Sequence, residues 1–204
     1  MSIAMEAAAV GLENGDVMSR AEFHRRYSQC PDLHRVELIE GVVYMPSPIR
    51  FKGHGREQAL ILHWLLRYTE SHEGVEAVGP ATVLLDDENE PEPDAMLFRV
   101  TEERFEDDYI KGPPELIVEI AGSSRARDMH QKKRAYEGAG VREYIVWRTR
   151  EEKAIDWFVL RDGAYVAQVA DGAGIIESAE FPGLRLDVGA MLALDRARVL
   201  AALG

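Results

Sequence analysis

An acidic residue stands in the middle of an apolar segment of this chain. Residues 115–121 read Glu-Leu-Ile-Val-Glu-Ile-Ala, so Glu119 interrupts a run of aliphatic, strand-forming side chains. A continuous apolar run of this length is typical of a central strand that is covered on both faces of a sheet. A glutamate is rarely buried in such a place unless a cation or a hydrogen-bond donor pairs with it. The segment therefore predicts both a central strand and a buried charged site.

A basic segment and a second apolar pattern follow. Residues 128–136 combine Lys and Arg with apolar side chains at helical spacing, and Gly138 or Gly140 is placed to end the helix. Residues 143–147 have the composition of another buried strand. A strand, a helix and a strand in this order predict two parallel strands that are joined by a right-handed crossover.

The other segments predict a mixed sheet flanked by helices. Ser19 and Glu22 form a capping-box pattern, which predicts a helix that reaches about Tyr27. We expect residues 1–16 to be flexible and residues 17–204 to form a single domain of the α/β (α+β) class. Further patterns predict a hairpin of 35–39 and 42–45, a long helix over 54–71, strands over 75–78, 81–85 and 94–98, a charged surface segment over 101–111, antiparallel strands over 154–160, 164–169 and 184–186, and a terminal helix over 191–203.

The net charge and the cysteine count limit the function classes. The 36 Asp and Glu residues exceed the 24 Lys and Arg residues, which gives a formal net charge of −12. This balance argues against a general affinity of the whole surface for nucleic acid, but it allows a local basic patch. The single cysteine, Cys30, excludes an internal disulfide and a cysteine-based zinc site, which favours a cytoplasmic protein. We expect no signal peptide, and no apolar run is long enough to span a bilayer.

Two carboxylates are expected to lie close together at one end of the sheet. Asp94 opens a strand after an acidic, proline-rich turn, and Glu119 lies near the end of the neighbouring candidate strand. Two buried carboxylates repel each other, and burial raises their pKa values further. A cation such as Mg²⁺ relieves both effects, and the backbone carbonyl of Ile120 could add a further oxygen ligand. With a lysine nearby, this combination is typical of a site that hydrolyses phosphodiesters.

The helical spacing of the basic segment distinguishes its two neighbouring lysines. Met129, Lys132, Tyr136 and Ala139 lie three or four residues apart and therefore share one face of the predicted helix. Lys133 is turned away from that face by about 100°. We therefore expect the ammonium group of Lys132 to reach the carboxylates, and to lower their pKa values.

The motifs around these residues resemble those of a known family. Asp94 follows Pro93, Glu119 lies in Pro-Glu-Leu-Ile-Val-Glu-Ile, and Lys132 precedes Gly-Val-Arg-Glu-Tyr at 140–144. Glu-Leu-Ile-Glu-Gly at 37–41, His54 and Phe-Pro-Gly-Leu-Arg-Leu at 181–186 continue the likeness. The spaced combination resembles the large bacterial family of putative restriction endonucleases in the PD-(D/E)xK nuclease superfamily, over roughly residues 17–195.

The resemblance implies a restriction-endonuclease-like mixed sheet, a divalent metal (Mg²⁺ or Mn²⁺) and DNA hydrolysis. By position it makes Asp94 and Glu119 metal ligands, and Lys132 the catalytic base or electrostatic stabiliser. It also places Glu37 as a further acidic residue at the edge of the pocket. Ala121 stands where the superfamily has its usual lysine, two residues after the acid, so Lys132 would have to reach the site from the helix.

Other interpretations of the same residues stay open. Asp94 could be solvated, and Glu119 could form a structural ion pair with Arg142 or Lys132. In that case the chain is a nuclease-like binding or regulatory module without turnover. A glycosidase that uses a pair of carboxylates is a more distant alternative, because it does not call for the lysine.

A dense group of cations adjoins the predicted site and could bind DNA. It consists of Arg125, Arg127, Lys133 and Arg134 beside Lys132. In an acidic chain such a group suits a surface that faces phosphates, but it also fits a solvated helix face.

Two groups of apolar residues toward the C-terminus could contribute to binding or to assembly. Trp157 and Phe158 could form a platform for stacking bases, or they could belong to the core. The apolar residues of the terminal helix over 191–203 predict a homodimer.

Overall fold

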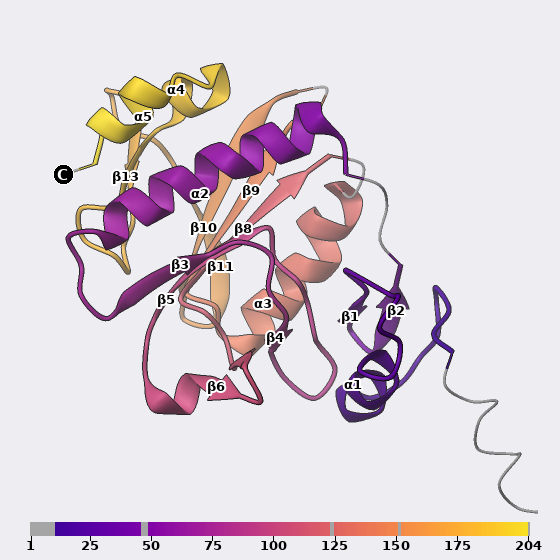
Figure 1. Cartoon of the computed structure of the whole chain (residues 1–204). Helices are drawn as coiled ribbons and strands as arrows, with labels where there is room; N and C mark the ends of the chain where they lie inside the picture. Colours follow the sequence, from indigo (N-terminus) through magenta and orange to yellow (C-terminus); the bar gives the residue numbers. More distant parts are fainter. Residues whose placement is uncertain (1–10, 46–48, 123–124, 151, 204) are drawn as a thin grey trace, which may run out of the picture.

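A six-stranded mixed sheet forms the centre of the protein in the computed structural model (Figure 1). The structure describes residues 11–45, 49–122, 125–150 and 152–203. The strand order is β11-β10-β9-β8-β5-β3, in which β8 and β9 are parallel and the other neighbours are antiparallel. The strands are β3 (Val75–Val78), β5 (Ala95–Arg99), β8 (Leu116–Ala121), β9 (Glu143–Arg148), β10 (Ala154–Arg161) and β11 (Ala164–Gln168). The predicted α/β class and mixed sheet are therefore confirmed.

The strand–helix–strand unit forms as its sequence predicts. A wide π-helical segment, η4 (Arg127–Lys132), continues into α3 (Lys133–Ala139) between β8 and β9. Gly140 ends α3 in the left-handed conformation, with φ of 87°. This conformation favours glycine because it has no side chain to clash with the backbone. All six residues of β8 are buried, as expected for a central strand.

Helices cover both faces of the sheet and create two separate cores (Figure 1). Helix α2 (Arg56–Thr69) packs on one face together with α4 (Val188–Ala193) and α5 (Arg196–Ala201). Helix α3 packs on the other face, beside a small sheet of β4 (Val83–Leu84), β6 (Phe105–Glu106) and β7 (Tyr109–Lys111). Trp157 and Phe158 are buried, one in each core, so they are core residues and not a platform for stacking bases.

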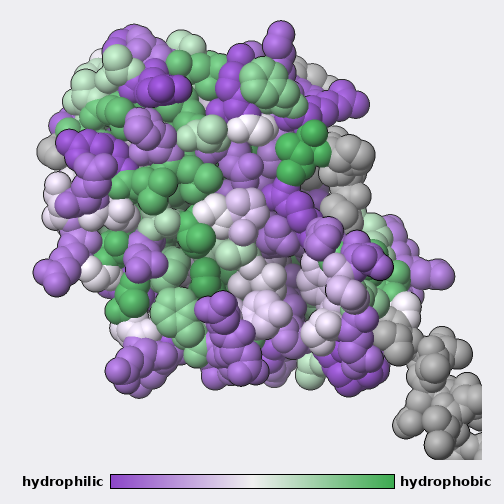
Figure 2. All heavy atoms as spheres, in the orientation of Figure 1, coloured by the Kyte–Doolittle hydropathy of each residue, from purple (hydrophilic) through white to green (hydrophobic). Residues whose placement is uncertain are grey.

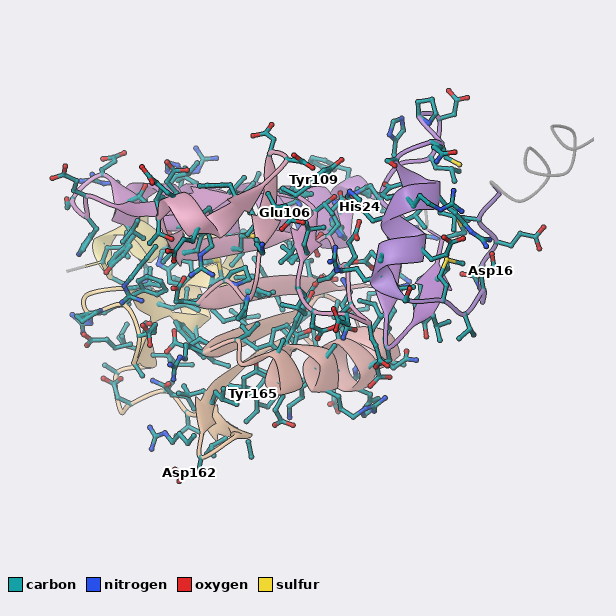
Figure 3. All side chains as sticks on the ribbon, turned by 90° about the horizontal axis from the view of Figure 1, so that it is seen from below. Asp16, His24, Glu106, Tyr109, Asp162 and Tyr165 are labelled. Carbon is teal, nitrogen blue, oxygen red and sulfur yellow. The ribbon has the colours of Figure 1, made fainter. Side chains whose placement is uncertain are left out.

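A smaller N-terminal unit lies beside the main sheet. It comprises α1 (Arg20–Tyr27), which Ser19 caps, and a hairpin of β1 (Glu37–Ile39) and β2 (Val42–Tyr44). The unit has its own hydrophobic cluster and is joined to the rest through paired backbone hydrogen bonds between Leu38 and Glu90 of 2.9 and 3.1 Å. Figure 3 shows a second contact, where the His24 ring of α1 lies edge-on against the Tyr109 ring of β7. This unit carries Glu37 to the main body.

Three expectations differ from the structure. Within the predicted flexible segment, residues 1–10 lie outside the described residues. Leu12 is buried and Gly15 donates a hydrogen bond to the Val43 carbonyl, so these two residues of 11–16 are held against the N-terminal unit. The segment 101–111 is not only a surface excursion, because it forms η3 (Glu102–Arg104), β6 and β7, with Ile110 buried. The terminal helix is divided in two, because Leu194 adopts a left-handed conformation with φ of 59°.

The apolar residues of this C-terminal region pack inside the chain. Met191 and Val199 are fully buried in the core beneath α2, and β12 (Ile175–Glu177) pairs with β13 (Arg185–Asp187) next to them. Homodimer formation stays a prediction, which a light-scattering mass compared with the 22.9 kDa of one chain checks. Among the described residues, no helix has both the length and the apolar character needed to cross a membrane.

Candidate active site

A charged cavity of about 440 Å³ opens where the C-terminal end of β8, the segment η4 and the β1–β2 hairpin meet. All four sequence-predicted site residues line it, although they come from four different elements. Its acidic lining is Glu37, Glu92, Asp94, Glu119 and Asp128, and its basic lining is Arg35, Arg50, Lys52, Arg127, Lys132 and Arg150. The centre of the site is buried, since Asp94, Glu119 and Lys132 are each 6% exposed or less.

The register of two strands brings Asp94 next to Glu119. Ala95 of β5 lies opposite Val118 of β8, so the residue before Ala95 lies level with the residue after Val118. The Oδ2 atom of Asp94 accepts a hydrogen bond of 2.8 Å from the backbone N–H of Ile120. The expected juxtaposition of the two carboxylates is therefore confirmed.

Lys132 is the lysine that faces the carboxylates. Its ammonium nitrogen lies 2.8 Å from Glu119 Oε1 and 2.6 Å from Glu37 Oε1. The Tyr136 hydroxyl donates a hydrogen bond of 2.7 Å to the same oxygen of Glu119. Lys133 points elsewhere, with its ammonium 3.8 Å from the centre of the Phe158 ring. The geometry confirms the helix face that the sequence predicts.

The burial of these groups controls their protonation. Burial raises the pKa of Glu119 well above its usual value, and the charges of Asp94, Asp128 and Glu37 raise it further. Lys132 lowers it, as the sequence predicts, but burial outweighs the lysine, so the pKa of Glu119 is raised overall. Burial also opposes the charge of Lys132, yet Glu119 and Glu37 outweigh this effect and hold the pKa of the lysine above its usual value. Three acidic side chains and one lysine therefore act on Glu119 at the buried centre of the cavity.

Glu37 reaches the cavity from the N-terminal hairpin. Besides Lys132, its Oε1 atom accepts a hydrogen bond of 2.9 Å from the Glu92 backbone N–H. Its Oε2 atom lies 3.6 Å from the guanidinium of Arg127. Glu37 thus ties the hairpin to η4 and to the loop before β5, in a position where it also helps to hold Lys132.

The structure adds two residues whose place beside Asp94 the sequence analysis did not predict. His54 Nε2 lies 3.1 Å from Asp94 Oδ1, and Arg35 lies 3.8 Å from the same oxygen. His54 is presented by the segment η2 (Phe51–Gly55), in which Gly53 has φ of 85°. The sequence Gly-His-Gly before the long helix indicates an exposed histidine, because glycines on both sides of it favour a tight turn.

Contacts with Thr149, directly after β9, and with Glu57 of α2 hold this segment in place. The Thr149 hydroxyl donates a hydrogen bond of 2.7 Å to the Gly53 carbonyl, and the Gly53 N–H donates one of 2.9 Å to Glu57. A Cβ atom added at Gly122 would come within 3.4 Å of the same carbonyl, so the backbones approach closely there. The position of His54 is therefore fixed by the fold.

The cations that the sequence analysis grouped together are separated in the structure. Arg127 lines the cavity, whereas Arg134 forms a two-fold ion pair with Glu40 of the hairpin turn, with distances of 2.8 and 2.9 Å. Arg50, Lys52 and Arg150 line the cavity from other segments. The basic part of the cavity is thus assembled from residues that are distant in the sequence.

The donor set suits a metal that keeps most of its waters. Among the described residues, no group of three or more His, Cys, Asp or Glu side chains is arranged to hold a metal ion. Asp94 and Glu119 provide two carboxylates at the buried centre of one cavity. One or two carboxylates with waters and substrate oxygens are what Mg²⁺ requires, so these residues fit Mg²⁺ or Mn²⁺ better than a metal caged by the protein.

The comparisons with known proteins agree with this fold. The family model Uma2, described as putative restriction endonuclease, matches residues 20–189. The chain is also similar to the crystal structure of a putative nuclease of the DUF820 family from Anabaena variabilis, with a TM-score of 0.66 and 13% identity, over 83% of this chain and 96% of that one. No curated protein matches the chain. Because the family model covers most of the chain, the protein belongs to the Uma2 family of putative restriction endonucleases.

Proposed function

We propose that the protein is a metal-dependent endonuclease that hydrolyses phosphodiester bonds of DNA. The observation that carries the proposal is the ammonium of Lys132, which lies between Glu119 and Glu37 in a cavity that Asp94 shares. A buried pair of carboxylates with an adjacent lysine combines the groups that metal-assisted phosphodiester hydrolysis requires. Membership of the Uma2 family supports the same reaction class.

The acidic neighbours of Glu119 support a metal at this place. Asp94 and Glu119 would hold Mg²⁺ or Mn²⁺, which would lower the pKa of a bound water and polarise the phosphate. A cation beside Glu119 would also remove the unfavourable interactions with Asp94 and Asp128 that raise its pKa. Such a metal would therefore stabilise the ionised form of Asp94 and Glu119.

The protonation of Lys132 decides between its two candidate roles. Its pKa lies above its usual value, so it is an ammonium ion at neutral pH and cannot accept a proton from water. A fixed positive charge instead stabilises the negative charge that develops on the phosphate oxygens in the transition state. We therefore assign Lys132 the role of electrostatic stabiliser rather than that of base, with Glu37 and Tyr136 as positioning residues.

The test combines metal binding with cleavage. Calorimetric titration of Mn²⁺ into the wild type should show binding that Asp94→Asn loses, because this change keeps the size of the side chain and removes its charge. Mn²⁺ should also support cleavage within a panel of single-stranded, duplex and branched DNA substrates at low salt, and Asp94→Asn should abolish it. Equal Mn²⁺ affinity in the two proteins, at unchanged thermal stability, would contradict the metal site.

A nuclease-like binding module without turnover is the second candidate. The observation that favours it is the pairing of Lys132, whose ammonium is held between two carboxylates. Such a group is also what a purely structural buried ion pair looks like. Salt-sensitive DNA binding without cleavage of any substrate in Mn²⁺ would support this candidate over the enzyme.

A further inference from the structure

A second, mainly apolar groove lies next to the catalytic cavity. It has a volume of about 710 Å³ and runs along the first turns of α2 toward the break between α4 and α5. Phe51, Ala59, Leu60 and Leu194 contribute its apolar lining, and Arg56 and Arg196 contribute cations. Figure 2 shows the face that carries α2, where hydrophobic and strongly hydrophilic residues lie side by side. The proposed reaction does not use this groove.

The tripeptide Arg50-Phe51-Lys52 separates the groove from the cavity. Arg50 and Lys52 line the catalytic cavity, whereas Phe51 lines the groove and is 73% exposed. Neither cation forms an ion pair with a carboxylate of the described residues, although the chain carries a net charge of −12. The exposed ring of Phe51 therefore lies between two cations, at the border of the catalytic cavity and the groove.

The exposure of Phe51 is a property of the fixed turn that carries it. The Gly55 N–H donates a hydrogen bond of 3.1 Å to the Arg50 carbonyl, which closes the turn. Gly53, within the same turn, is held by Thr149 and Glu57 as described above. The ring is thus presented to the solvent by a segment that is anchored on both β9 and α2.

We propose that Phe51 and the adjoining groove bind one unpaired base of a DNA strand, while Arg50 and Lys52 hold the neighbouring phosphates at the mouth of the catalytic cavity. The identity of the ligand as DNA rests on the proposed function. An aromatic ring between cations offers the alternating stacking and phosphate contacts that single-stranded nucleic acid requires. Arg196 adds positive charge to the lining of the groove, whereas Arg56 is paired with Glu57 at 2.8 Å.

This arrangement selects DNA with unpaired bases over blunt duplex. The bases of a duplex are stacked and paired, so the ring of Phe51 reaches a base only where the strand is single or the base has left the stack. The substrate class is therefore single-stranded DNA, or duplex DNA with a tail, flap or gap.

Fluorescence anisotropy with oligonucleotides of one sequence tests this selection. The wild type in EDTA, and the Asp94→Asn variant in Mn²⁺, should bind single-stranded and tailed DNA on the order of tenfold more tightly than blunt duplex. Phe51→Ala should lose this preference and keep its duplex affinity. Lys52→Ala should weaken binding to all forms and lower the slope of log affinity against log salt by about one.

Two variants serve as matched controls. Phe105→Ala removes another exposed phenylalanine, on β6, and Arg161→Ala removes an exposed cation at the end of β10. Neither residue lines the cavity or the groove, so both variants should bind DNA like the wild type. A 2-aminopurine base in the single strand should lose fluorescence on binding to the wild type, because stacking on Phe51 quenches it, and not on binding to Phe51→Ala.

The outcomes separate this inference from the proposed function. DNA binding that depends on Phe51 without any cleavage would leave the inference standing and refute the enzyme. Cleavage of single-stranded and blunt duplex DNA with equal efficiency, unchanged by Phe51→Ala, would refute the inference and leave the enzyme. A wild type that binds no DNA would refute both. If the wild type has the mass of a dimer and Phe51→Ala has the mass of a monomer, the groove binds a second copy of the chain instead.

Discussion

Lys132 and Glu119 meet at 2.8 Å in a place where both side chains are almost completely buried. Their backbones belong to η4 and to the central strand β8 that precedes it. The same lysine also contacts Glu37, so one ammonium links the main sheet to the N-terminal hairpin. A single cation therefore contributes both to the candidate chemistry and to the attachment of the N-terminal unit.

Lys132→Met should destabilise the protein strongly at neutral pH. It keeps the apolar stem but leaves Glu119 and Glu37 without their buried counter-charge, a loss that costs about 3–5 kcal/mol. Without the lysine the pKa of Glu119 rises further above its unfolded value. A raised folded pKa means that stability falls as pH rises, so the deficit should grow between acidic and neutral pH. Denaturant unfolding at several pH values measures this.

Lys133→Ala is the matched control for Lys132→Met. Lys133 contacts the Phe158 ring and forms no ion pair with a carboxylate of the described residues, so its removal should cost only about 0.5–1 kcal/mol, with little dependence on pH. It should also leave Mn²⁺-dependent cleavage intact, apart from weaker DNA affinity. Equal and pH-independent losses in the two variants would show that the ammonium of Lys132 is not the partner of Glu119.

Tyr136→Phe should impair metal binding without changing the packing. The change removes one hydroxyl, which donates to Glu119 at 2.7 Å, and it should cost about 1–3 kcal/mol because it removes a buried donor to a charged group. Tyr144→Phe is a matched control, since the Tyr144 hydroxyl is also buried but donates to the Asp128 carbonyl. Calorimetry should show a lower Mn²⁺ affinity for Tyr136→Phe alone, and a loss of similar size in both variants would contradict the positioning role.

Gly53→Ala should reduce cleavage more than its effect on stability explains. Gly53 has φ of 85°, where a side chain costs about 1 kcal/mol, and its Cβ would contact the Thr149 hydroxyl at 3.4 Å. Gly74→Ala has the same backbone cost, with φ of 77° and open space around the added atom. Both should lower the unfolding free energy similarly, but only Gly53→Ala should disturb His54 and Lys52, and the rate of DNA cleavage reports this difference.

Glu143 should make stability fall as pH rises through the mildly acidic range. Burial raises the pKa of Glu143 above the ordinary 4.5. Hydrogen bonds from Ser178 and from the backbone N–H groups of Ala179 and Glu180 lower it, but burial outweighs them. The folded state then holds a proton that the unfolded state has lost, so the contribution is complete below about pH 4.5 and disappears as pH rises through the folded pKa. Glu143→Gln should flatten this part of the stability profile in thermal unfolding, and an unchanged slope would contradict the assignment.

The sequence alone determined the elements and the direction of the key lysine. The apolar run around Glu119 specifies a central strand because strands covered on both faces need continuous apolar side chains, and all of β8 is buried. The spacing of Lys132 and Tyr136 places both on the sheet side of the helix because helical residues four apart share a face. These features follow from local periodicity, which the sequence shows directly.

Only the tertiary structure decided which distant side chains meet. The contact of His54 with Asp94, the arrival of Glu37 at Lys132, and the placement of Arg50 and Lys52 at the cavity depend on strand register and on turns anchored by residues far away in the sequence. The high pKa of Glu119 has the same origin, because burial arises from the packing of several elements and outweighs the lysine that the sequence places beside it. Local patterns fix elements and faces, whereas contacts between elements and the resulting desolvation are properties of the assembled fold.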